Sequence, residues 1–387
     1  MISKIKNAIR DIIIFFFSIF PVQKKIVFIN FNGRGFGCNP KYIALKCIET
    51  KLDVDMVWLV NNYYDDIPIE IRQVKWGNVR FFYELATAKV IITNVKNRLP
   101  FKKKKSQWMM QTWHGSHAFK FVEKEAEDQL SPDYVRASKE NSRITDLFIS
   151  DSPLTSKWYR DAFYCECEIA ETGSPRDDIL FCNSSSIRKK IRERLCIDDE
   201  TKLILYAPTF RSNNFTKSYD FDYNAIITTM HEKFGGDWKV MLRAHPNETW
   251  RGEACDFSDE IINVSKWGDV QELCIISDVL ITDYSAICND FFKMNKPVFL
   301  YVPDFDDYIK NNRRLKKNYY ELPLNRNLNT DELKKEILNF DADNYFNNIT
   351  AYKKKYQFIK ECHASDKVVQ IINAKLNCDY DQHKRGR

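Results

Sequence analysis

The sequence predicts an α/β protein built from two Rossmann-like domains, and three observations support this fold class. Short runs rich in Val, Ile, Leu and Phe alternate with helix-like segments of ten or more residues. Such alternation is typical of parallel sheets covered by helices on both faces. The 387 residues also exceed what one hydrophobic core usually organises. A polar segment near the middle then separates two groups of these runs, so we expect two domains.

Nine apolar segments are expected as strands, because each is short, apolar and bounded by turn or helix signals. They are Lys25–Asn30, Val54–Val60, Val90–Thr93, Gln107–Gln111, Leu147–Ser150, Leu203–Ala207, Trp238–Arg243, Val279–Ile281 and Pro297–Tyr301.

The boundary between the two domains is expected in the polar segment Cys182–Glu200. Asn183–Ser186 is a loop or helix-cap signal, and a charged helix follows from Ile187 to about Leu195. The organisation expected from this boundary is a membrane-associating segment (1–21), an N-terminal domain (22–182), a linker (183–200), a C-terminal domain (201–340) and C-terminal helices with a basic tail (341–387).

The N-terminus combines basic and apolar residues. Lys4, Lys6 and Arg10 precede the apolar run Ile12–Phe20, and no small-residue cleavage site follows. That run has nine residues, while a membrane-spanning helix needs about 20. Two interpretations are open: a short helix lying in the membrane interface, or a first helix packed on the domain. We favour the membrane interface, because three consecutive phenylalanines beside basic residues suit it.

Composition narrows the function classes. The net charge of +6 is modest for this length and does not indicate a nucleic-acid binder, although it allows attraction to anionic ligands or membranes. Eleven cysteines, an odd number without a CxxC pair, suit a reducing cytoplasm. We therefore expect no structural metal.

The first candidate site is Gln111–Ser116, which follows a predicted strand. In parallel sheets, ligands bind beyond the carboxyl ends of the strands. A histidine there, His114, has a pKa near neutrality that suits proton abstraction from a hydroxyl. From the motif alone, a structural histidine in a turn is equally consistent. Gly115 and Ser116 are candidate substrate contacts beside it.

The predicted second domain supplies cationic residues after two of its strands. Arg211 has the side chain of a bidentate phosphate donor, although a surface ion pair is the alternative. Arg243 and His245 form a denser pair at another strand end, and Pro246 fixes the turn after them. This pair is stronger evidence for an anion site than either residue alone.

A further segment, Thr282–Ala286, follows the strand Val279–Ile281. Ser285 is expected as the N-cap or first-turn residue of a helix over Ala286–Met294, where free backbone N–H groups can cradle a phosphate. A plain capped helix is the alternative. Asp283 could bind a ribose hydroxyl or cap the turn, and Thr282 is a candidate substrate contact beside it.

Taken in order, these segments resemble the CDP-glycerol glycerophosphotransferase family of teichoic-acid and capsule polymerases. The resemblance extends from about Asn30 to Asn312. It is carried by Gly33–Phe36, Asn39–Tyr42, Ala86–Asn94, Gln111–Ser116, Thr172–Arg176, Asp178–Leu180, Tyr206–Arg211, Arg243–Pro246, Ile276–Ser285 and Lys296–Pro297.

The resemblance implies a GT-B-like fold with two Rossmann-like domains facing a central cleft and the nucleotide held by the C-terminal domain. It also implies peripheral attachment at the cytoplasmic face of the cell membrane. The implied reaction moves glycerol phosphate or ribitol phosphate from CDP-glycerol or CDP-ribitol to a lipid-linked or polymeric acceptor and releases CMP. His114 and His245 are then the expected catalytic residues, with His114 as general base.

Two departures from the family pattern stand out. The family often has proline where this chain has His117, and the tract after Asn312 lacks expected Gly-Phe-Tyr and Pro-Gly-Pro features. These departures bear on the acceptor and on the alcohol of the donor. Two alternative functions are kept: a GT-B glycosyltransferase that uses a nucleotide sugar, and a catalytically inactive membrane-bound scaffold of a polymer-synthesis complex.

Overall fold

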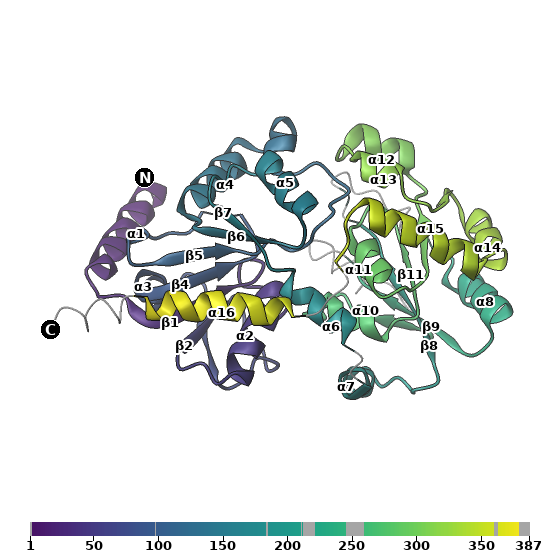
Figure 1. Ribbon diagram of the computed structural model, residues 1–387, viewed down its shortest axis with the longest axis horizontal. Coiled ribbons are helices and arrows are strands. Elements are labelled where there is room, and N and C mark those ends of the chain that lie inside the picture. The colour runs from purple at the N-terminus through teal and green to yellow at the C-terminus, as the bar shows by residue number, and fades with distance from the viewer. Residues whose placement is uncertain are drawn as a thin grey trace. The chain divides into compact units, whose positions relative to one another are not determined.

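The computed structural model describes residues 2–96, 98–182, 185–209, 211, 221–244, 259–359 and 363–378, with side chains from residue 10 onward (Figure 1). The chain divides into two compact units. The first contains Met1–His114, Val122–Asp178 and Cys362–Arg387, and the second contains Gly115–Phe121 and Ile179–Glu361. The arrangement of the two units about a central cleft stays a prediction.

The first unit holds a seven-stranded parallel sheet in the order β3-β2-β1-β4-β5-β6-β7. Its strands are β1 (Gln23–Ile29), β2 (Asp55–Val60), β3 (Ile71–Lys75), β4 (Ala88–Thr93), β5 (Trp108–Gln111), β6 (Leu147–Ser150) and β7 (Glu168–Glu171). Its helices are α1 (Ile2–Ser18), α2 (Cys38–Glu49), α3 (Val79–Thr87), α4 (Pro132–Ile144), α5 (Pro153–Ala162) and α16 (Ala364–Asn377), with short 3₁₀ turns η1 (Glu123–Gln129) and η2 (Pro175–Asp177).

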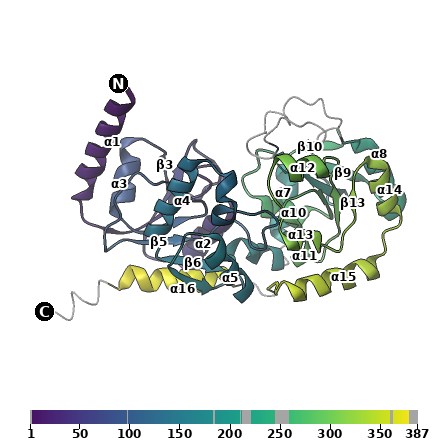
Figure 2. The ribbon, with the colours of Figure 1, turned by 90° about the horizontal axis from the view of Figure 1, so that it is seen from above.

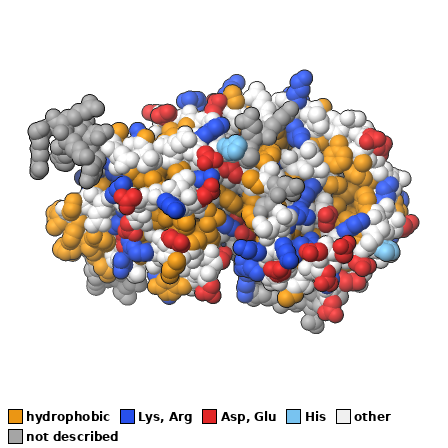
Figure 3. Space-filling view, turned by 60° about the horizontal axis from the view of Figure 1, so that its bottom comes forward, with side chains coloured by type: hydrophobic (Ala, Val, Ile, Leu, Met, Phe, Trp, Pro, Cys, Tyr) orange, Lys and Arg blue, Asp and Glu red, His pale blue; other side chains and the backbone are white. Residues whose placement is uncertain are grey.

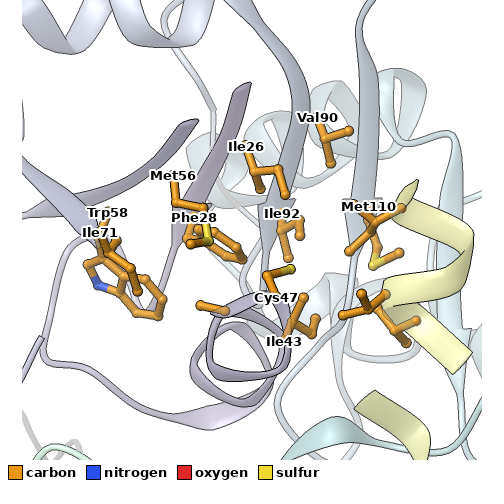
Figure 4. Packing of buried hydrophobic residues seen from close by; sticks show 14 of the residues in the cluster. Ile26, Phe28, Ile43, Cys47, Met56, Trp58, Ile71, Val90, Ile92 and Met110 are labelled. Carbon is orange, nitrogen blue, oxygen red and sulfur yellow. The ribbon is translucent and has the colours of Figure 1, made fainter. Parts of the chain in front are cut away.

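The core of this unit follows from the two-residue period of its strands, which sends alternate side chains to opposite faces. On one face, the register aligns Phe28 with Trp58 of β2 and Ile92 of β4. Figure 4 shows this row packed over Ile43 and Cys47 of α2, all fully buried. The intervening residues, such as Val27 and Ile91, form a second cluster on the opposite face.

The second unit holds a six-stranded parallel sheet in the order β10-β9-β8-β11-β12-β13. Its strands are β8 (Lys202–Ala207), β9 (Trp238–Leu242), β10 (Ile261–Asn263), β11 (Val279–Thr282), β12 (Val298–Tyr301) and β13 (Arg326–Asn327). Its helices are α7 (Ser185–Arg194), α8 (Tyr223–Phe234), α10 (Val270–Ile276), α11 (Ile287–Lys293), α12 (Phe305–Asn311), α13 (Lys317–Tyr320), α14 (Thr330–Leu338) and α15 (Ala342–Lys355), while α6 (Asp178–Phe181) spans the junction of the units.

All nine strands expected from the sequence are confirmed, with end points that differ by at most two residues. The four unexpected strands, β3, β7, β10 and β13, are the edge strands of the two sheets. An edge strand has one neighbour and buries less apolar surface, so its hydrophobic signal is weak. In β7 no residue is fully buried. The helix expected at Ile187 is also present, as α7.

The compact units are discontinuous, whereas the domains expected from the sequence were continuous ranges. Helix α16 packs on α2 in the first unit and buries Val368, Val369, Ile372 and Leu376 there. Burial of each such side chain contributes about 1.5–3 kcal/mol, which explains why the chain returns to the first unit. The segment 115–121 joins the second unit, and α7 packs on α10 instead of forming a free linker.

Helix α1 has apolar residues on two sides. Ile13, Ile14 and Phe17 pack against the first unit's core, as the packed-helix interpretation expected. Figure 2 shows α1 alongside α3, and the two helices are in contact. On the other side, three apolar residues of the helix stay exposed, Ile12 (67%), Phe15 (73%) and Phe16 (52%), as does Ile19 (68%) in the turn that follows. Within the described residues, no helix has the length and apolar character to span a membrane.

Candidate functional site

The site in the first unit is built on the loop that leaves β5. Trp113 adopts φ of 51°, a left-handed conformation that is uncommon outside glycine and that occurs often at functional sites. Side-chain amides hold this backbone in place. The Trp113 N–H donates to Oε1 of Gln111 (2.9 Å), and Nδ2 of Asn39 donates to the carbonyls of Thr112 (3.2 Å) and Trp113 (3.0 Å). His114 follows directly on this fixed loop.

The imidazole of His114 is oriented by one hydrogen bond. Its Nδ1 lies 2.8 Å from the carbonyl oxygen of Asn94, the residue that follows β4. A carbonyl can only accept, so Nδ1 carries the proton and the lone pair of neutral His114 is on Nε2. Burial lowers the His114 pKa to about 4, and the charge of Arg176 also lowers it, while the Asn94 bond opposes the shift. His114 is therefore a neutral base at pH 7.

Asn94 is itself held by neighbours at the carboxyl end of β1. Its Nδ2 donates to Oδ1 of Asn30 (2.8 Å), and its Oδ1 accepts from the N–H of Phe31 (2.9 Å). These bonds fix the loop whose carbonyl orients His114. Asn94 lies in Ala86–Asn94, one of the segments that carry the family resemblance, but the sequence alone did not indicate that it orients His114.

Arg176, on η2, contacts the candidate base, and the sequence alone indicated no role of its own for this residue. Its guanidinium donates to the carbonyl of His114, and its backbone N–H donates to Oδ1 of Asn39 (2.9 Å). The turn Thr172–Arg176 gave only a weak signal, because its residues look like an ordinary loop. In the folded chain this turn brings a fixed positive charge to the backbone of the candidate base.

In the second unit, the segment after β11 is directed inward. The hydroxyl of Thr282 donates to the carbonyl of Ala207 (2.6 Å). Asp283 is buried and accepts from the N–H (2.9 Å) and the hydroxyl (2.6 Å) of Thr209. Both residues join β11 to the chain leaving β8. Of the two interpretations of Asp283, the structural one matches these contacts, and the substrate contacts expected for Thr282 and Asp283 stay predictions.

Arg211 is 1% exposed and is a buried ion-pair partner, and the phosphate contact expected of it from the sequence stays a prediction. Its Nη2 lies 2.8 Å from Oδ2 of Asp283, and its Nε lies 2.7 Å from Oδ2 of Asp304. Nη2 also donates to Oδ1 of Asp304 (3.1 Å), and Nη1 donates to the carbonyl of Thr209. These contacts agree with the ion-pair alternative for Arg211, although the ion pair is buried and not at the surface. Arg211 supports the loops around it.

Ser285 and Arg243 are partly exposed and lie beyond strand ends of the second sheet. Ser285 Oγ accepts weakly from the N–H of Ile287 (3.4 Å), and the helix behind it begins with Ala286 as N-cap. Nη1 of Arg243 donates to the carbonyl of Trp267 (2.8 Å). His245, the second expected catalytic histidine, and Pro246 lie outside the described residues.

The remaining expected residues lie on the segment 115–121 of the second unit. Gly115 is partly exposed and Ser116 is buried. His117 is buried and stacks on Phe358, with ring centroids 4.3 Å apart and planes within 4°. It has a role in packing, which the sequence did not reveal. Among the described residues, no group of three or more His, Cys, Asp and Glu side chains could hold a metal ion.

Comparison with known proteins now decides the family. A family model for CDP-Glycerol:Poly(glycerophosphate) glycerophosphotransferase matches residues 12–374. The chain belongs to this family. The resemblance drawn from its motifs is thereby confirmed, as is the class of enzyme: a transferase of a phosphoalcohol from a CDP-activated donor.

Two relatives and one structure show how far the similarity extends. The teichoic acid poly(glycerol phosphate) polymerase of Bacillus spizizenii is 28% identical over 96% of this chain and 100% of its own length. The teichoic acid glycerol-phosphate transferase of Staphylococcus aureus is 28% identical over 91% of this chain and 93% of its own. The wall teichoic acid polymerase TagF superposes with a TM-score of 0.84 at 26% identity, covering 98% of this chain and 97% of that chain. These matches confirm the α/β fold with parallel sheets.

Proposed function

We propose that this chain transfers glycerol phosphate or ribitol phosphate from a CDP-activated donor to a hydroxyl of a lipid-linked or polymeric cell-surface acceptor. The observation that carries the proposal is the His114 imidazole, whose Nδ1 is fixed 2.8 Å from the Asn94 carbonyl. That contact leaves Nε2 as the proton acceptor. Two further matches support the donor: TagF has been solved after a soak with CDPG, and relatives include polymerases of both glycerol phosphate and ribitol phosphate.

In the proposed reaction, His114 Nε2 takes the proton of the acceptor hydroxyl. The acceptor oxygen forms a bond to the distal phosphorus of the donor as the bond from that phosphorus to the CMP oxygen breaks. CMP leaves with the electron pair. Phosphoryl transfer depends mainly on positioning and on stabilisation of charge. Burial lowers the pKa of His114 to about 4, and the negative charge of donor phosphates beside it would oppose that shift and make Nε2 a stronger base.

The donor's phosphates are proposed to bind to the second unit. Ser285 and Arg243 are the partly exposed candidates beyond its strand ends, and His245 is the predicted partner of Arg243. Arg211, Asp283 and Thr282 shape the same loops from inside. We therefore propose that these three residues affect donor binding indirectly, by fixing the backbone of the loops that would contact its phosphates.

Release of CMP from CDP-glycerol and from CDP-ribitol tests the function and distinguishes the two alcohols. General-base help is worth about 10²–10⁴-fold, so His114→Ala should lower turnover by that factor without unfolding the protein. His231→Ala, at an exposed histidine that bonds the Gly236 carbonyl, is the matched control. Near-normal turnover in folded His114→Ala would exclude the general-base role. Release of UDP or GDP would favour the glycosyltransferase, and tight CDP binding without turnover would favour the scaffold.

The exposed side of α1 supports peripheral attachment to the cytoplasmic face of the membrane. Ile12, Phe15 and Phe16 of α1, together with Ile19 in the turn directly after it, follow the i, i+3, i+4, i+7 spacing of one helical face. Figure 3 shows hydrophobic side chains gathered at the left edge of the view, on the first unit. Insertion of a Phe side chain contributes about 1.5–3 kcal/mol.

Sedimentation with vesicles that contain anionic lipid tests this attachment. Phe15→Ser/Phe16→Ser should weaken binding by at least about 10-fold. Ile69→Ser, at an apolar residue that is 96% exposed elsewhere in the first unit, should leave it unchanged. Equal binding of both variants would refute the role of α1.

A further inference from the structure

Lys120 is a partly buried cation to which the proposed reaction assigns no role. It lies on the segment 115–121 of the second unit, six residues after His114. Across the described residues, its ammonium group makes no hydrogen bond and no ion pair. Burial lowers the pKa of Lys120 to about 8, the nearby charges of Arg211 and Arg313 lower it further, and Asp283 opposes the shift.

The backbone around Lys120 is held firmly. Lys120 forms an antiparallel bridge with Leu315, the Phe121 N–H donates to the Arg314 carbonyl (3.1 Å), and the Lys316 N–H donates to the Phe119 carbonyl (2.7 Å). Phe119 is fully buried. Neighbouring side chains of an extended segment point to opposite faces, so the buried Phe119 fixes the direction in which Lys120 leaves the segment.

The charges near Lys120 do not balance. Asp283 is the carboxylate that favours its charged form, but that carboxylate already accepts from Thr209 and pairs with Arg211. Arg211 in turn uses Asp304 as its second partner. Among the residues that the structure describes, the charges of Arg211, Lys120 and the exposed Arg313 thus outnumber two carboxylates, Asp283 and Asp304, which already bind Arg211 and its neighbours. A desolvated cation without a partner is costly unless an anion binds beside it.

We propose that Lys120 binds a phosphate oxyanion of the substrates held by the second unit. The inference rests on the proposed function, since the diphosphate of a CDP donor supplies this chemistry. A phosphodiester of the acceptor polymer supplies it as well. Lys120 donates from Nζ to the oxyanion and so takes the direct role that the buried Arg211 leaves open.

Calorimetric titration with CDP, with pyrophosphate and with glycerol 3-phosphate tests the proposal at pH 7. Lys120→Met should bind the preferred probe about 10- to 100-fold more weakly, as expected for a charged hydrogen bond. Lys120→Arg should keep most of the affinity. The matched control is Lys317→Ala, which removes an exposed lysine of the same unit that pairs with Glu321 at 3.4 Å.

The pH dependence of CDP affinity is a second measurement, and it would not depend on Lys120 if this lysine had only a structural role. The ammonium is charged below about pH 8 and loses its proton above it, so affinity for CDP should fall as pH rises through that value. Binding near pH 8 should therefore take up protons, seen as a buffer-dependent enthalpy. Lys120→Arg should show neither effect, because arginine stays charged.

The probes separate the possible outcomes. A loss for CDP and pyrophosphate assigns Lys120 to the donor, and a loss confined to glycerol 3-phosphate assigns it to the acceptor phosphate. Unchanged affinity for all three probes in a Lys120→Met protein with normal melting temperature overturns the proposal. If Lys120→Met does not fold, a pH profile of Lys120→Arg identical to that of the unmodified protein overturns it instead. Absence of CMP release by the unmodified protein would refute the proposed function, while the pyrophosphate titration still decides the role of Lys120.

Discussion

Replacement of Arg211 by methionine is the sharpest test of how the second unit supports its loops. The guanidinium is 1% exposed and contacts Asp283 at 2.8 Å and Asp304 at 2.7 Å. Arg211→Met leaves two buried carboxylates without their cation, and breaking such a pair costs about 3–5 kcal/mol. A domain of this size loses about 2–4 °C of Tm per kcal/mol. We therefore expect Tm to fall by about 6–20 °C.

Thermal and urea unfolding followed by circular dichroism measure this loss. Asp304→Asn in the Arg211→Met background should restore part of the stability, because it removes one of the unpaired charges. Lys317→Ala breaks an exposed pair and should change stability by no more than about 0.5 kcal/mol. If Arg211→Met melts at the normal temperature but binds CDP at least about 10-fold more weakly, the phosphate-donor interpretation would be right and the structural one wrong.

Three further predictions follow from single contacts. His117 has φ of 54°, which proline cannot adopt. His117→Pro should therefore destabilise the protein by about 3 kcal/mol or more in chemical unfolding, although the family often has proline at this position. His117→Ala is the control, because it removes only the stacking of the imidazole. Asp178 accepts hydrogen bonds from the N–H groups of His363, Ala364 and Ser365 at the start of α16. Asp178→Ala should therefore lower the free energy of unfolding by about 1–2 kcal/mol and increase proteolysis at α16. An unchanged cleavage pattern would exclude a capping role for Asp178. The His114 pKa is lowered from 6.5 to about 4. As pH falls, His114 of the unfolded chain is therefore protonated before His114 of the folded protein, and the free energy of unfolding declines between pH 6.5 and about 4. His114→Gln should remove this decline, and a pH–stability curve identical to that of the unmodified protein would contradict the pKa shift.

The interior of each sheet was predictable because its strands are continuous apolar runs. β1 and β4 carry buried residues at successive positions, since both faces of a parallel sheet are covered. Edge strands lack that signal, as β10 and β7 show. The return of α16 to the first unit was also beyond the sequence, because an amphipathic helix specifies an apolar face but not the surface that receives it.

The sequence was sufficient to predict which loops form the candidate site, but not which way the side chains on those loops point. Parallel topology places the loops after β5, β8 and β11 at carboxyl ends, so motifs found there were correctly associated with strand ends. Whether a residue in such a loop faces solvent or the interior depends on its tertiary partners. Asp304 and Asn94 are those partners for Arg211 and His114, and both are distant in sequence from the residues they hold.

This distinction divides the recognisable motifs into residues that hold the loops and residues that can touch substrate. In Thr282–Ser285, the side chains of Thr282, Asp283 and Tyr284 are buried and only Ser285 is partly exposed. Tyr284 donates to Asp304, the carboxylate that also pairs with Arg211. The buried residues of this motif therefore hold the loop in place, and the proposed contacts with phosphate fall to the partly exposed Ser285 and Arg243 and to Lys120. Substitutions inside the motif should lower stability and activity together, whereas Lys120 variants should lose phosphate affinity while the fold stays intact.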